Sequence, residues 1–174
     1  MYFKELPIPE NVSVELAGNK IKVSGPKGSL EKELKLGREI KIEKLENRIK
    51  VSSEKERRKI KALVGTIAAH IRNMIKGVTK GFVYRLKVVY MHFPITVKVE
   101  GNKVLLHNFL GERVPRVAKI IGNVQVKVEG PEVIVSGIDL DDVSLTASNI
   151  EQACRIKARD RRIFQDGCWI VSRE

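Results

Sequence analysis

Short segments of alternating apolar and polar residues dominate the chain. Residues 12–16 and 21–23 alternate on either side of Gly18-Asn19. This pattern predicts a β-hairpin with positive-φ residues at its bend. Further strands are predicted at residues 29–34, 40–44 and 48–52, and a longer one at 82–89 with Phe82, Tyr84, Leu86 and Val88 on one face.

Between residues 53 and 77 the apolar period changes from two to that of a helix. The i, i+3, i+4, i+7 spacing predicts one buried stripe. We expect Ser53 and Glu56 to form a capping box before this helix and Gly77 to end it. The stripe consists of Ile60, Leu63, Val64, Ile67, Ile71, Met74 and Ile75.

The order of segments occurs twice. Residues 11–24 return at 94–107, and residues 39–52 match 123–136. Two copies are too few for a solenoid, so we predict an α+β fold of two tandem similar domains, each a mostly antiparallel sheet backed by one helix. The predicted domains are 1–82 and 83–174, with 77–90 an ordered connection. Second-copy strands are predicted at 95–99, 103–107, 113–118, 124–128 and 133–136, and a helix at 143–158 with Val143, Ala147, Ile150 and Cys154 inside.

The charge distribution points to a nucleic-acid partner. The formal net charge is +12, and residues 57–99 hold ten basic residues and no acidic one. Neutralised phosphates release counterions, which makes nucleic acid the usual partner of such a window. The basic residues do not lie opposite a broad Trp/Phe-rich face, and no apolar run is long enough to span a membrane, so no membrane partner is expected.

Several motifs have a competing structural explanation. Gly25-Pro-Lys-Gly28 matches the GxxG loop of KH domains, but it lies between predicted strands and is better explained as a turn with a basic tip. The carboxylates of residues 139–142 are expected to cap a helix rather than hold a metal. Cys154 and Cys168 are too few for a disulfide framework, which fits a reducing cytoplasmic setting. We therefore predict no catalytic residues, no cofactor and no metal.

The C-terminal run is the most specific segment. Arginines are concentrated at residues 155–162, more densely than helix capping requires, and their planar guanidinium groups suit bidentate contact with phosphates. We expect Arg155, Arg159 and Arg162 to project along one side as the chain leaves the second helix.

At these residues the chain resembles the large-subunit ribosomal protein six (L-six) family, in its archaeal–eukaryotic branch. The matching tail positions are Gln152, Ile156, Arg159, Arg162, Phe164, Asp166-Gly167 and Arg173. Residues 8–12, 25–28 and 108–113 also fit, so the resemblance covers essentially the whole chain. Cys168 and Trp169 depart from it, standing where the family usually has an aliphatic residue and Tyr.

The resemblance implies a non-enzymatic ribosomal protein of the cytoplasm. Its partners would be large-subunit ribosomal RNA near the stalk base, neighbouring large-subunit proteins, and elongation factors docking nearby. The alternatives are a free RNA-binding chaperone and a metal-dependent RNA phosphodiesterase using residues 139–142. From the charge and the resemblance together, the expected RNA contacts are Lys27, Arg72, Lys76, Arg113, Arg116, Arg155, Arg159, Arg161, Arg162 and Phe164.

Overall fold

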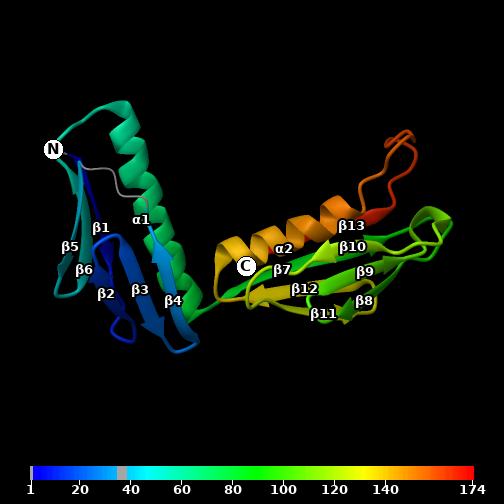
Figure 1. The fold of residues 1–174 in the computed structure, drawn as a ribbon, viewed down its shortest axis with the longest axis horizontal. Helices are drawn as coiled ribbons and strands as arrows, with labels where there is room; N and C mark the ends of the chain where they lie inside the picture. Colours follow the sequence, from blue (N-terminus) through cyan, green and yellow to red (C-terminus); the bar gives the residue numbers. More distant parts are fainter. Residues whose placement is uncertain (1, 35–38) are drawn as a thin grey trace. The chain divides into compact units, whose positions relative to one another are not determined.

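The chain folds as two compact units that meet at the Gly81–Phe82 bond. The computed structural model describes residues 2–34 and 39–174 (Figure 1). The boundary lies one residue before the predicted one, because Phe82 begins a strand that pairs within the second unit. Each unit is described by itself below.

The described residues of the first unit form two three-stranded antiparallel sheets and one long helix. One sheet has the order β1-β6-β5 and the other the order β2-β3-β4. Helix α1 packs against strands of both sheets (Figure 1). The elements are β1 (Tyr2–Pro7), β2 (Ser13–Ala17), β3 (Lys20–Gly25), β4 (Gly28–Glu33), β5 (Ile40–Leu45), β6 (Arg48–Ser53) and α1 (Arg58–Thr79).

The second unit repeats this plan and adds a strand. Its sheets have the orders β10-β9-β8 and β11-β12-β7-β13, and α2 packs against β7, β10, β12 and β13 (Figure 1). The elements are β7 (Phe82–Val89), β8 (Thr96–Glu100), β9 (Lys103–His107), the 3-10 turn η1 (Phe109–Gly111), β10 (Arg116–Lys119), β11 (Gln125–Glu129), β12 (Glu132–Gly137), α2 (Leu140–Ala153) and β13 (Gly167–Arg173).

The predicted fold class and internal duplication are confirmed. Six strands followed by a helix occur in both units, and all the strand pairings of the described residues are antiparallel. Each unit divides its strands between two small sheets where the sequence had predicted one. The positive φ of Gly18 and of its counterpart Gly101 forms the predicted hairpin bends.

Each unit has its own apolar core. The alternating strand residues and the helical stripe meet there, as the two periodicities predict. In the first unit Ile21, Ile49 and Ile71 are fully buried, and in the second Leu86, Leu106 and Ile150 are.

The predicted ends of α1 were wrong. The helix begins at Arg58, and Ser53 instead completes β6, where it pairs with Tyr2 and Ile40. The sheet therefore takes the residue that the capping-box pattern assigned to the helix. At the other end the helix passes through Gly77, and Gly81, with φ of +77°, supplies the left-handed residue that follows the last turn.

Other differences concern strands and the end of α2. The sequence did not predict β1 or β13, and the strand predicted from Arg113 begins only at Arg116. Helix α2 ends at Ala153 and not at the predicted Ala158. A longer helix would turn position 157, seven residues after the buried Ile150, toward the core. Instead Lys157 is exposed and Ile156 is buried. No helix among the described residues is long and apolar enough to cross a membrane.

Two glycines of the first unit predict opposite effects of a methyl group. A Cβ on Gly25 would lie 2.7 Å from Cγ2 of Val78, so Gly25→Ala should destabilise the unit by about 1–3 kcal/mol. A Cβ on Gly65 in α1 has its nearest neighbour at 3.6 Å, so Gly65→Ala should stabilise the unit by about 0.5–1 kcal/mol. Hydrogen exchange of the α1 amides measures both changes, and equal signs would contradict this packing.

Candidate nucleic-acid interface

A loop rich in arginine leaves the end of α2 and returns to the sheet as β13. We call residues 154–166 the tail loop. In Figure 1 the tail loop and the segment between β9 and β10 project from the same end of the second unit. Arg155, Arg159, Arg161 and Arg162 are all exposed, as is Lys157, which our prediction of site residues had omitted although it lies in the same basic run. The predicted arginines therefore leave the end of the helix as expected, but the helix ends earlier, so Arg155 also lies on the loop.

The tail loop is ordered by its own hydrogen bonds. Asp160 Oδ1 accepts a hydrogen bond from the backbone N–H of Arg162 at 2.9 Å, and the Asp160 carbonyl accepts from the N–H of Phe164 at 2.9 Å. Trp169 Nε1 donates to the Gln165 carbonyl at 3.2 Å and so ties the loop to β13. The arginines are thus presented from a defined turn, which reduces the conformational entropy they lose on binding.

Arg116 connects the tail loop to the other exposed loop of this end. Its Nη1 donates to the carbonyls of Ala153 and Arg155, at 3.0 and 2.8 Å. Its Nε and Nη2 donate to the two oxygens of Glu112, at 2.9 and 2.6 Å, and the guanidinium lies 4.2 Å from the centre of the Phe109 ring. Arg116 was predicted as an RNA contact, but its guanidinium is used to hold the end of α2.

The segment that Arg116 joins to the tail loop adds a second basic tip. Arg113 is exposed in the connection between η1 and β10, and the neighbouring Val114 is 76% exposed. The charge of Lys157 contributes to lowering the pKa of Glu112, after the larger effect of Arg116, so the two loops lie within electrostatic reach. The structure therefore brings Arg113 and the tail-loop arginines to one end of the second unit.

Phe164 is a support for the loop and only half-exposed. It packs against the core of the second unit, and the Arg159 guanidinium lies 4.8 Å from the centre of its ring. A cation–π contact of this kind holds the arginine without neutralising it. Phe164 was predicted to contact RNA, and its position indicates that it orients Arg159.

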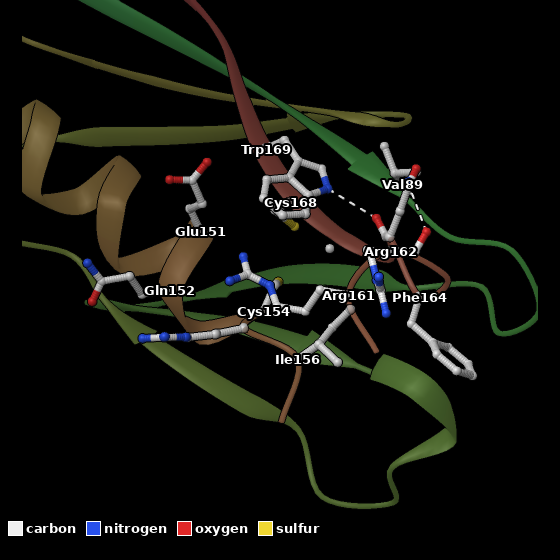
Figure 2. Close-up of a pocket in the computed structure, with 13 residues that line it drawn as sticks. Val89, Glu151, Gln152, Cys154, Ile156, Arg161, Arg162, Phe164, Cys168 and Trp169 are labelled. Carbon is white, nitrogen blue, oxygen red and sulfur yellow. Dashed lines mark hydrogen bonds between the residues drawn. The ribbon is translucent and has the colours of Figure 1, made fainter. Parts of the chain in front are cut away.

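A pocket opens where the tail loop meets α2 and β13. It has a volume of about 650 Å³, and Arg155, Arg161 and Arg162 line it together with the apolar Ile156 and Trp169 (Figure 2). In the close-up the Phe164 ring lies at the outer end of the group, away from Cys154 and Cys168. No pattern in the sequence predicts this pocket, because it depends on β13 and on the early end of α2.

The predicted contacts of the first unit form a separate group. Lys27 lies in the turn between β3 and β4, where its Nζ donates to the Lys80 carbonyl and its backbone N–H donates to the Val78 carbonyl at 3.0 Å. Arg72 and Lys76 are exposed one turn apart on α1. The basic tip of this turn therefore caps the end of α1, and the KH-like reading fails because strands flank the motif.

The carboxylates before α2 act as the sequence predicts. Asp139 is the N-cap, and its Oδ1 accepts a hydrogen bond from the N–H of Asp141 at 2.9 Å. A Cβ on Gly122 would overlap with Asp142 Oδ2, so this carboxylate packs tightly on a turn. Within residues 2–34 and 39–174, no three His, Cys, Asp or Glu side chains are grouped to hold a metal ion.

One arginine of the cluster is partly neutralised within the loop. Arg162 Nη2 lies 2.8 Å from Asp160 Oδ2, and this hydrogen bond lowers the pKa of Asp160, which keeps the carboxylate charged. Asp160→Asn should therefore strengthen RNA binding, because it frees the Arg162 guanidinium while the amide oxygen still accepts from the backbone N–H. The logarithm of the RNA affinity should also fall more steeply with the logarithm of the salt concentration, by the slope of about one phosphate contact.

Glu54→Gln provides the matched control for this prediction. It frees Lys41 from an exposed pair of 3.0 Å in the first unit and changes the net charge equally. Salt titrations of RNA affinity compare the two variants. An equal gain in both would show an effect of net charge alone, contrary to a specific role of the tail loop.

Comparison with known proteins decides the family. The family profile described as ribosomal protein L6 matches residues 8–81 and 93–167. The chain belongs to the ribosomal protein L6 family. It is 51% identical over 171 residues to the large ribosomal subunit protein uL6 of Ignicoccus hospitalis, an alignment that covers 96% of this chain and 92% of that protein. It is 52% identical to the uL6 protein of Staphylothermus marinus, with 97% and 92% covered, and 50% identical to that of Desulfurococcus amylolyticus, with 98% and 94% covered.

The L6 matches agree with the duplicated fold. The two matched stretches lie one in each unit, and together they include the tail loop up to Gly167. The resemblance stated from the tail motif is confirmed, including its archaeal branch, and these relatives bear the name of a ribosomal protein rather than of an enzyme.

Proposed function

We propose that this L6-family chain is a structural component of the large ribosomal subunit and binds large-subunit ribosomal RNA through the tail loop and the tip around Arg113. The observation that carries the proposal is the alignment of nearly the whole chain with proteins named for the large ribosomal subunit. The exposed arginines, held on an ordered loop, supply the chemistry that such a role requires.

The mode of binding follows from the side chains available. Aromatic residues make up 5% of the chain, so stacking of splayed bases contributes little. Guanidinium groups reach phosphates bidentately and from several directions, which suits the backbone of folded RNA. The chain would hold RNA helices in place passively, as a rigid anchor.

The proposed location follows from the family resemblance. The RNA site would lie near the stalk base, where elongation factors dock, with neighbouring large-subunit proteins as further partners. The proposed cellular location is therefore the ribosome in the cytoplasm. A metal-dependent phosphodiesterase is disfavoured because Asp139 is committed to capping α2.

Directed hydroxyl-radical probing tests the site. Val114→Cys and Ile163→Cys, at side chains that are 76% and 70% exposed, would each carry Fe–EDTA into reconstituted large subunits. We expect cleavage of the ribosomal RNA around the stalk base from both positions. Thr66→Cys, exposed on α1, and the unsubstituted chain are the controls. Cleavage from Thr66→Cys alone would reject the tail loop as the interface.

A further inference from the structure

The two cysteines stand at the two ends of the tail loop. Cys154 directly follows the last residue of α2, and Cys168 is the second residue of β13. Both side chains are buried, 4% and 1% exposed, and both line the pocket under the loop (Figure 2). A covalent bond between them would close the loop that presents the arginines.

The two segments are in direct contact. The backbone N–H and the thiol of Cys168 both hydrogen-bond to the Cys154 sulfur. A Cβ built on the neighbouring Gly167 would lie 3.4 Å from the Cys154 Cβ. That distance shows how closely the two chain segments pack, and the hydrogen bond between the two sulfurs shows that the cysteine side chains themselves meet, as a disulfide requires.

The surroundings make the two thiols unequal. The hydrogen bonds from Cys168 and the charge of Arg116 lower the pKa of the Cys154 thiol, despite its burial. The Cys154 interaction and burial raise the pKa of Cys168. Because the thiolate is the attacking species in thiol–disulfide exchange, Cys154 is suited to attack an oxidant and Cys168 to resolve the product.

A small oxidant can reach this pair through the pocket. A volume of about 650 Å³ accommodates a low-molecular-weight disulfide. The lining arginines, Arg155, Arg161 and Arg162, favour a reagent that carries carboxylates.

We propose that Cys154 and Cys168 form an intrachain disulfide that staples the base of the tail loop. The Cys154 thiolate attacks a low-molecular-weight disulfide, forms a mixed disulfide and releases one thiol. Cys168 then loses its proton and attacks the Cys154 sulfur, which releases the second thiol. The protein dithiol is oxidised by two electrons, and the small disulfide is reduced to two thiols. A single staple is compatible with the absence of a larger disulfide framework.

Thiol trapping tests the bond. The full chain is equilibrated in mixtures of reduced and oxidised glutathione, quenched in acid, denatured and alkylated with N-ethylmaleimide before intact-mass analysis. A parallel sample is refolded from guanidinium chloride in the same buffers, which removes any limit set by access. We expect a monomer that has lost two hydrogens and takes up no maleimide. Two maleimides at every ratio in both samples, or linked dimers only, would overturn the proposal.

Single variants separate the two roles. Cys168→Ser should accumulate glutathione on Cys154, whereas Cys154→Ser should gain less, since burial still raises the pKa of the remaining Cys168 thiol. The loop closed is about 15 residues long, so the oxidised second unit should unfold on the order of 10 °C above the reduced one. Trp169, the chain's only tryptophan, reports this transition by fluorescence. The same melting temperature in both states would contradict a staple, whatever the outcome of RNA binding.

Discussion

Replacing Arg155, Arg159 and Arg161 with alanine is expected to weaken binding to large-subunit ribosomal RNA by about one to two orders of magnitude. These side chains are exposed and have no carboxylate partner among the described ion pairs. Each is therefore available to one phosphate, and its loss removes the release of one counterion. The slope of log affinity against log salt concentration should become shallower by about two to three units. Filter binding over a series of salt concentrations would measure this slope.

A triple variant of the first unit is the matched control for this experiment. Lys41, Arg48 and Lys55 pair with Glu54, Glu5 and Glu39, so their replacement by alanine removes equal charge from residues that are already neutralised. We expect this control to change the salt dependence little. An unchanged slope in the tail-loop variant, or equal losses in both, would contradict the phosphate role of the tail loop.

Arg116→Ala is expected to destabilise the second unit by about 3 kcal/mol. The variant leaves the carbonyls of Ala153 and Arg155 without their charged donor and removes the paired contact with Glu112. Hydrogen bonds to charged groups contribute about 1.5–3 kcal/mol each, with partial recovery by water. Urea unfolding followed by Trp169 fluorescence measures the change. RNA binding should also weaken, because the tail loop loses its attachment to the Glu112 segment.

Arg85→Ala is the control for Arg116→Ala. Arg85 is a half-buried arginine of the same unit, 3.9 Å from Glu174, and the loss of this long ion pair should cost below about 0.5 kcal/mol. An Arg116→Ala variant of unchanged stability but weakened RNA binding would show that Arg116 contacts RNA itself, which is the role we no longer assign to it.

The effect of Arg116 should depend on pH in a defined direction. Its hydrogen bond lowers the pKa of Glu112 below the ordinary value of 4.5. The contribution of the pair is therefore complete above pH 4.5 and is lost as pH falls through the lowered pKa. The stability difference between the unsubstituted chain and Arg116→Ala should shrink over this acid range.

The fold could be predicted from sequence wherever a period or a repeat was present. The alternation in β2 and β3 and the stripe of α1 give the core directly, and the duplication gives the order of elements in the second unit. Strand β1 was missed because its inward positions, Tyr2, Lys4 and Leu6, include a lysine, while the apolar Phe3 lies on the outward face and is 50% exposed. The start of α1 was wrong because pairing of Ser53 with Tyr2 outweighs a local cap.

The candidate site could be predicted by residue type but not by role. The arginine cluster was visible as a composition, and its exposure agrees with that prediction. Arg116 could not be separated from it, because its role depends on the carbonyls of Ala153, at the end of α2, and of Arg155, in the tail loop, both more than 35 residues away. Phe164 was likewise assigned to RNA from the family motif, although it packs on the core.

The second copy has one strand more than the first, β13, and this strand fixes the arginine-rich tail loop to the unit. Helix α1 is followed directly by β7 of the next unit, whereas α2 is followed by the tail loop and β13. Both ends of the tail loop are therefore fixed to the second unit. The RNA contacts that we propose therefore lie on one copy of the duplicated scaffold.

Sedimentation of the chain in cell extract tests the central claim most directly. Extract from cells that express the tagged chain is separated on a sucrose gradient, and the tag is followed by immunoblot. We predict that the chain migrates with free large subunits and with whole ribosomes, and that high salt weakens this association more for the Arg155, Arg159 and Arg161 triple variant. A chain that stays at the top of the gradient at low salt would be a free RNA-binding protein, and the assignment to the large subunit would be wrong.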